Sequence, residues 1–288
     1  MTHPLLAALR SGAVEERRAA CDAAPGDPSA VLLVDALVAA LGDRDPLVVR
    51  AAVRALERIG RDHDGVTTAL QAALRSEDPR QRLEAAWTWA RLEPPPVRLL
   101  PAVVSVLERV DGDARWRAAR LLVELGRIHG EVAPVVLGLA GPERAPRVRR
   151  IALTALRELA PGAPETLRAH LDASRDPDLG LQRLALTGLA GLRAPTALLW
   201  ERLTSVLEGH ADPVCRRIAA TAVGALGDPP DAARAALVRS AAGDAEPSVR
   251  AAATRALAGL GSHKTSSAAQ PRAERGAGER SQKDPNSA

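Results

Sequence analysis

The chain has 288 residues, a formal net charge of +4 and a hydrophobic content of 46%, with only two cysteines. This composition is sufficient for a packed core, but no apolar run approaches the roughly 18 residues of a membrane span. The cysteine number argues against a disulfide scaffold and fits a reducing compartment. The apolar residues are mainly Ala, Leu and Val, with no Phe or Tyr, which favours closely packed helices over sheets.

The first residues, MTHPLLAALRSGAVEERR, lack the basic region and long apolar stretch of a signal peptide. We therefore expect a cytoplasmic protein without membrane association. A short helical segment, AVEERRAACDAA, follows from Val14. It is the weakest of a series of related segments along the chain.

Residues 45–60 read DPLVVRAAVRALERIG and predict a helix, because Asp45 is a good N-cap and Pro46 suits the first helical position. Closely similar segments recur every 33 or 34 residues. We call the first helical residue of each copy its anchor, and we number columns of equivalent residues from it. The anchors are Pro46, Pro79, Gly112, Pro146, Leu179, Pro213 and Pro247.

The sixth residue after every anchor is Ala, and the tenth and thirteenth are mostly Leu. At 100° per residue these columns share one helix face. A second apolar helical segment precedes each anchor. Each unit is therefore predicted to be helix, turn, helix, and because one pair cannot bury both of its apolar faces, the units must stack into a solenoid.

The Asp-Pro turn, an Arg three residues after the anchor and an ALxxLG ending resemble the HEAT-repeat family, in particular the short bacterial HEAT-like repeats of the phycobilisome-lyase type. The resemblance covers residues 1–261. It implies an all-α fold, a right-handed α-solenoid of about eight helix-turn-helix repeats of 33–34 residues, which acts mainly as a binding scaffold. Residues 262–288 lose the apolar periodicity and are rich in Ser, Gly, Pro and charge, so we predict a disordered polar tail.

In the HEAT family the Arg three after the anchor usually bonds to acidic turn residues of neighbouring units, so we expect a structural role for this column. Its members are Arg82, Arg115, Arg149, Arg216 and Arg250, and the acidic residues directly before the anchors are the expected partners: Asp45, Asp78, Asp111, Asp212 and Glu246.

No motif indicates catalysis. None of the six histidines lies at metal-ligand spacing from another ligand, and the His-Glu pairs that carry iron in HEAT-like deoxyhypusine hydroxylases are missing from the sequence. Cys21 and Cys215 fit small core positions. We therefore expect no catalytic residues, no metal and no cofactor, and a protein that is not an enzyme.

The columns four and eight after the anchor point away from the core, and in HEAT-like arrays this face lines the concave groove. Arg and Thr dominate both columns, but Trp87 and Trp116 interrupt them in neighbouring units. Trp89 belongs to a core column, and Trp200 is expected to pack against its neighbours. Because Trp and Arg are enriched at binding hot spots, the predicted partner-binding residues are Trp87, Trp116, Leu83, Arg50, Arg54, Arg120, Arg150, Arg183 and Arg217.

We therefore expect a monomeric scaffold or adaptor whose concave groove binds a protein segment with acidic and apolar side chains. The alternative partner is nucleic acid, since HEAT-like alkylpurine DNA glycosylases hold DNA on a basic concave face with Trp and a carboxylate. Neither exposed column has an Asp near the two tryptophans, so the alternative is a protein that binds DNA without excising a base. The net charge of residues 1–261, 34 − 32 = +2, is low for a nucleic-acid-binding protein. A cofactor-handling lyase of the phycobilisome type is the third reading.

Overall fold

The computed structural model describes residues 3–107, 109, 112–192 and 195–267, and every regular element among them is helical. The α-helices form eight consecutive pairs. The first helices of the pairs are α1 (Pro4–Leu9), α3 (Val34–Ala40), α5 (Gly65–Ala73), α7 (Leu100–Val106), α9 (Val132–Leu139), α11 (Pro164–Ala173), α13 (Ala197–Gly209) and α15 (Asp231–Gly243). The second helices are α2 (Val14–Ala23), α4 (Pro46–Ile59), α6 (Pro79–Leu92), α8 (Gly112–Ile128), α10 (Pro146–Leu159), α12 (Leu179–Leu189), α14 (Pro213–Leu226) and α16 (Pro247–Ser267).

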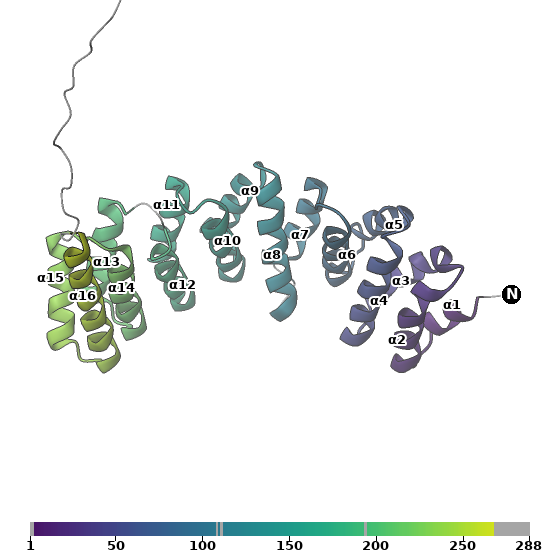
Figure 1. The fold of residues 1–288 in the computed structure, drawn as a ribbon, viewed down its shortest axis with the longest axis horizontal. Helices are drawn as coiled ribbons and strands as arrows, with labels where there is room; N and C mark the ends of the chain where they lie inside the picture. The colour runs from purple at the N-terminus through teal and green to yellow at the C-terminus, as the bar shows by residue number, and fades with distance from the viewer. Residues whose placement is uncertain (1–2, 108, 110–111, 193–194, 268–288) are drawn as a thin grey trace, which may run out of the picture.

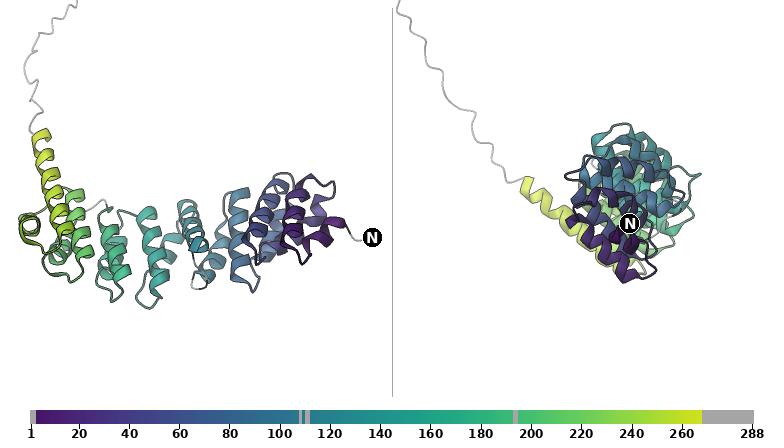
Figure 2. Two further views of the ribbon diagram at one scale, coloured as in Figure 1. Left: turned by 90° about the horizontal axis from the view of Figure 1, so that it is seen from below. Right: turned by 90° about the vertical axis from the view of Figure 1, so that its right-hand side faces the viewer.

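The pairs stack in chain order into a shallow arch, with α1 and α16 at opposite ends of the stack (Figures 1 and 2). Each second helix contacts the second helix of the next unit, from α2 with α4 to α14 with α16. In Figure 1 the second helices follow the lower, concave side of the arch, whereas α5, α9 and α11 lie along its upper side. The predicted α-solenoid of helical pairs is confirmed.

The anchors explain where the second helices begin. All seven predicted anchors are the first residue of a second helix, and Val14 begins α2. The side chains of Asp45, Asp78, Asp178 and Asp212 each accept a hydrogen bond from a backbone N–H of the first turn, as N-cap residues do. Helix α16 continues to Ser267, six residues beyond the predicted boundary at Gly261. The rest of the predicted tail, residues 268–288, lies outside the described residues.

The core runs through the stack along the predicted columns. The Ala column is almost free of solvent, from Ala52 to Ala253, and Trp89 is 1% exposed. Cys21 and Cys215 are buried free thiols, and burial raises the pKa of these thiols to about 11 and about 12. Both cysteines are therefore the small core residues expected from the sequence.

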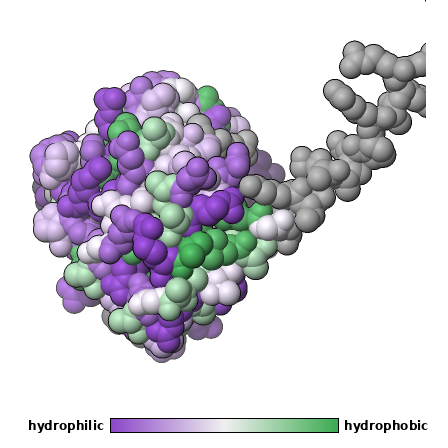
Figure 3. Space-filling view, turned by 90° about the vertical axis from the view of Figure 1, so that its left-hand side faces the viewer, coloured by the Kyte–Doolittle hydropathy of each residue, from purple (hydrophilic) through white to green (hydrophobic). Residues whose placement is uncertain are grey.

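The C-terminal end of the stack, formed by α15 and α16, is mainly polar, with an apolar area among the polar side chains (Figure 3). Val238 on α15 is about half exposed. A polar outer face suits a unit that no other described unit covers.

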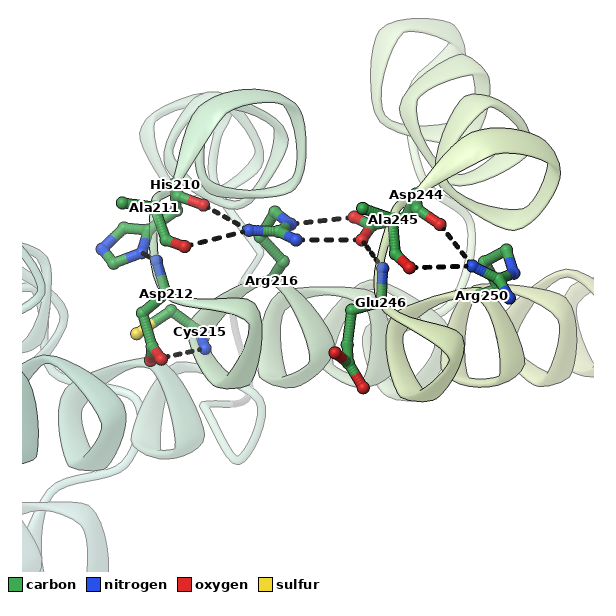
Figure 4. Close-up of polar contacts among 9 residues, drawn as sticks. All are labelled: His210, Ala211, Asp212, Cys215, Arg216, Asp244, Ala245, Glu246 and Arg250. Atoms are coloured by element: carbon green, nitrogen blue, oxygen red, sulfur yellow. Dashed lines mark hydrogen bonds and ion pairs between the residues drawn. The ribbon is translucent and has the colours of Figure 1, made fainter.

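The Arg column makes structural contacts, as predicted, but the carboxylates that bind Arg216 and Arg149 are not the predicted ones directly before the anchors. One of the predicted partners, Asp111, lies outside the described residues. Arg216 donates two hydrogen bonds to Asp244, the residue three before the next anchor, and further bonds to the carbonyls of His210 and Ala211 in its own turn (Figure 4). Arg17 with Asp43 repeats the arrangement, and so does Arg149 with Asp176. Asp45, Asp78 and Asp212, which lie directly before their anchors, serve as N-caps instead.

We call these inter-unit contacts, from the residue three after one anchor to the residue three before the next, ladder contacts. Gln182 and His210 form one with side chains of a different type, 3.0 Å apart. The α4–α6 and α6–α8 junctions differ, because the corresponding residues are Val49 with Ser76 and Arg82 with Arg109. Within the described part of the chain, neither of these two junctions has a ladder contact. The Nε of Arg82 is buried without a hydrogen-bond partner.

Candidate functional site

The inner-face columns are open to solvent at most, but not all, of the predicted positions. Trp116 is 61% exposed, Trp87 is half-buried, and Arg50, Arg54, Arg120 and Arg217 are exposed. Leu83, predicted to lie beside the two tryptophans on the surface, is 0% exposed, so that prediction is wrong. Four consecutive residues of α6, from Leu83 to Ala86, are buried. Such a run covers every side of a helix, which means that α6 is recessed between α4 and α8.

The recess creates a hollow of about 790 Å³, which we call the inner hollow. Its side walls come from α4 and α8, with the turn before α4, and Arg80 and Glu84 of α6 line it between them. Trp116 stands at one wall, where the guanidinium of Arg120 lies 5.5 Å from its ring centroid. The lining residues are Leu41, Asp43, Arg44, Pro46, Val49, Arg50, Arg80, Glu84, Gly112, Ala114, Trp116 and Arg117.

A smaller hollow of about 250 Å³ adjoins it and brings in Trp87, Arg54, Glu57 and Arg91. Arg50 and Arg117 line both spaces. The two tryptophans predicted to act together therefore lie in adjoining hollows that share two arginines.

We call the arginines of the columns four and eight after the anchor the arginine stripe. These arginines differ in whether another side chain of the protein already binds them. Arg150 bonds Asp178 at 2.6 Å, and Arg183 makes two 2.9 Å bonds to Asp212. In both pairs an arginine of one unit binds the N-cap aspartate of the next, which neutralises these two arginines. The pKa of Asp178 and that of Asp212 are lowered, primarily by these hydrogen bonds.

The inner hollow retains free positive charge. Arg44, Arg50 and Arg80 are exposed there, and none of their guanidinium groups forms an ion pair or hydrogen bond with the described residues. Arg54 is bound to Asp22 at 3.0 Å, with both side chains about half exposed. Arg217 is also unpaired within the described ranges, but it lies on α14, well away from the hollow.

An ion pair that the sequence analysis missed lines this hollow. Glu84 is 5% exposed and makes two bonds to Arg117, of 2.5 and 2.7 Å. Burial raises the pKa of Glu84, and the adjacent guanidinium opposes that rise only in part. The signal was present in the column five after the anchor, where these two residues are the only charged members, but the analysis followed the exposed columns.

His170 and Trp200 lie in packed surroundings outside the inner hollow. His170 is 1% exposed, its Nδ1 lies 2.9 Å from the Thr166 carbonyl, and burial lowers its pKa. Trp200 packs partly against the core, as predicted. Among the described residues no group of three or more His, Cys, Asp or Glu side chains is arranged to hold a metal ion, and no helix there is long and apolar enough to cross a membrane.

Stacked helical pairs with one continuous inner face define an α-solenoid repeat protein. A family model of HEAT repeats matches residues 2–90, 164–258 and 200–280. The chain belongs to the HEAT-repeat family. No curated protein matches it in sequence.

Several solved structures are similar in fold. YibA from E. coli is 17% identical with a TM-score of 0.56, over 89% of this chain and 91% of that chain. The karyopherin Kap121p, solved bound to the extreme C-terminus of the phosphatase Cdc14p, is 14% identical with a TM-score of 0.56, over 89% of this chain and 33% of that one. The CpcE–CpcF complex of phycocyanin lyase from Nostoc is 23% identical with a TM-score of 0.47, over 56% of this chain and 99% of that chain. These likenesses concern the fold.

Proposed function

We propose that the protein is a non-catalytic, cytoplasmic scaffold whose inner hollow binds a protein segment carrying acidic and apolar side chains. The observation that carries the proposal is the grouping of Arg44, Arg50 and Arg80, all unpaired within the described residues, around the exposed ring of Trp116. Arginine on a hollow rim attracts carboxylates, and a large aromatic ring supplies apolar contact area.

The electrostatic contrast along the stripe supports this location. Arg150 and Arg183 are already satisfied by aspartates of their own chain, so an acidic segment gains little there. At the inner hollow an acidic segment can bind the guanidinium groups of Arg44, Arg50 and Arg80 by displacing water, without breaking a contact between described residues. The proposed site is therefore narrower than the set of residues predicted from the sequence, and it spans α4, α6 and α8.

A displayed library of random peptides, selected on the whole protein, tests the proposal. We expect selected peptides to be enriched in Asp or Glu together with Leu, Ile or aromatic residues. Trp116→Ala should weaken them by about 2 kcal/mol, as hot-spot truncations do, and Arg50→Glu should weaken them at least as much through charge reversal.

Arg217→Glu is the matched control, because Arg217 occupies the same column as Arg50 and is likewise exposed and unpaired within the described residues. Its effect on binding should be small. Equal losses from Arg50→Glu and Arg217→Glu would show that the whole stripe binds rather than the inner hollow. Selected peptides without acidic residues, or insensitive to Trp116→Ala, would contradict the proposal.

Nucleic acid is the competing partner, since arginines beside an exposed Trp also suit a phosphate backbone with stacked bases. Labelled single- and double-stranded DNA, titrated at several salt concentrations, separates the two. Tight DNA binding with a steep fall in affinity as salt rises would indicate several phosphate contacts and favour that partner.

A further inference from the structure

The buried ion pair beside the inner hollow occupies a column that is otherwise apolar. Five residues after the anchor, the third and fourth units have Glu84 and Arg117, which pair across the α6–α8 junction. Burying an ion pair removes both charges from water, a cost that apolar side chains of similar size avoid. The other units use apolar residues in this column: Ala51, Ile151, Leu184, Ile218 and Ala252.

The two partners differ in their access to the hollow. The Arg117 side chain is 25% exposed and that of Glu84 is 7% exposed. Arg117 lines both hollows, and its Nε has no hydrogen-bond partner. A carboxylate attracted by Arg44, Arg50 and Arg80 would therefore arrive next to a guanidinium whose present acceptor is a side chain of the same protein.

We propose that this pair is exchangeable: a carboxylate of the bound segment takes the place of Glu84 on Arg117, and Glu84 accepts a proton from solvent as it gives up the contact. This inference rests on the proposed function. Arg117 remains charged throughout, so the buried charge stays compensated in both states. Glu84 and Arg117 would then determine specificity for an acidic segment.

Proton uptake follows from the surroundings of Glu84. Burial already raises its pKa in the presence of Arg117, and without the guanidinium an isolated buried carboxylate is more unfavourable still. The other ionisable groups lining the hollow are Asp43, Arg44, Arg50 and Arg80. Asp43 accepts two hydrogen bonds from Arg17. In the proposed complex the three arginines bind the acidic segment, so none of them replaces Arg117 as a partner of Glu84.

The sign of the pH dependence is fixed by this exchange. The complex holds one more proton than the free protein, so affinity for an acidic segment should increase as the pH falls, by up to about tenfold per pH unit. Glutamates of the segment itself, with a pKa of about 4.3, stay ionised from about pH 6 to pH 8.5. Within that range Glu84 is the group that accounts for the slope.

The experiment uses a short fluorescein-labelled peptide of Glu, Leu and Gly, titrated with the whole protein and followed by fluorescence anisotropy across that pH range. The wild type should bind more tightly at lower pH. Gln has the shape of a protonated Glu and cannot ionise. The Glu84→Gln variant should therefore bind the peptide more tightly than the wild type, and its affinity should no longer depend on pH in this range. Glu158→Gln is the matched control, because Glu158 also pairs with an arginine of a neighbouring unit, Arg127, but at an exposed position; it should retain the wild-type slope.

Calorimetry of the wild type in two buffers of different ionisation enthalpy measures the proton uptake directly and does not depend on the folding of a variant. Uptake of about one proton per complex is expected, as the linkage requires. Peptide binding without proton uptake, or with Glu84→Gln no tighter than the wild type, would overturn the exchange and leave the proposed function standing. Failure of the peptide to bind both the wild type and Glu84→Gln would overturn the two together.

Discussion

Small residues set how closely neighbouring units approach. A Cβ atom added to Gly224 on α14 would lie 2.8 Å from the Cβ and 3.0 Å from the Cα of Ala256 on α16. Because the second atom belongs to the backbone, a side-chain rotation cannot relieve the contact. Gly138 on α9, in contrast, has no atom within 4 Å of an added Cβ.

We predict opposite effects of the same substitution at these two glycines. Gly224→Ala should destabilise the protein by about 1–3 kcal/mol, the range for overpacked cores, in spite of the better helix propensity of Ala. Gly138→Ala should stabilise it by roughly 0.5–1 kcal/mol, since Gly costs conformational entropy inside a helix. Urea melts of the two variants check the prediction, and stabilisation by Gly224→Ala would mean that α14 and α16 are not in close contact.

Trp89 and Trp116 differ in burial and therefore in their expected contribution to stability. Trp89 is 1% exposed, whereas Trp116 is 61% exposed. Trp89→Ala should cost about 3–5 kcal/mol of folding stability, as large core truncations do. Trp116→Ala should cost less than about 1 kcal/mol. Denaturant melts of both variants decide this, and comparable losses would assign Trp116 to packing and remove it from the proposed site.

At the scale of elements, the ladder contacts tie the start of one second helix to the turn before the next. The pKa of Asp244 and that of Asp43 are lowered, first by the side-chain hydrogen bonds from Arg216 and Arg17. A carboxylate with a lowered pKa in the folded state stabilises the protein fully above its unfolded pKa of about 3.9, and this stabilisation is lost as the pH falls through the lower folded value.

We therefore predict that Asp244→Asn reduces stability at neutral pH by about 1–3 kcal/mol, the range for hydrogen bonds to charged groups, and makes the loss of stability in acid shallower. Thermal melts between about pH 2 and pH 7 measure both effects. Glu208→Gln is the control, since Glu208 pairs with Arg239 at an exposed position, and exposed pairs contribute about 0–1 kcal/mol. A wild-type acid profile for Asp244→Asn would contradict the structural role of the ladder.

At the scale of the whole molecule, most anchors were predictable because proline and aspartate have local preferences at helix starts. The repeat spacing of 33 or 34 residues located the two anchors without proline, Gly112 and Leu179. The burial of Leu83 was not predictable in this way. It depends on the recess of α6 between its neighbours, which the column pattern of one helix does not contain. The acceptor of Arg216 was missed for a related reason. Asp244 and Glu246 both lie in the turn before the next anchor, and only the relative placement of the two units shows that Asp244 is the one that Arg216 reaches.

The solenoid makes its contacts between adjacent units, so removal of a terminal segment should leave distant units intact. We predict that truncation after Ser267 leaves helix content and melting temperature unchanged, because residues 268–288 have the composition of a segment that cannot form a core. Circular dichroism of the truncated and full-length chains tests this. A drop of many degrees would show that the removed segment packs on the last unit.

The missing ladder contacts at the α4–α6 and α6–α8 junctions have a consequence for the proposed complex. In place of the ladder, these junctions carry the ion pairs Arg91–Glu57 and Arg117–Glu84, and the second of these pairs lies at the inner hollow, where a bound segment could reach it. A segment held by α4 and α8 together would therefore bridge the two junctions that lack ladder contacts, whereas Arg149–Asp176 and Arg216–Asp244 already link the units further along the stack.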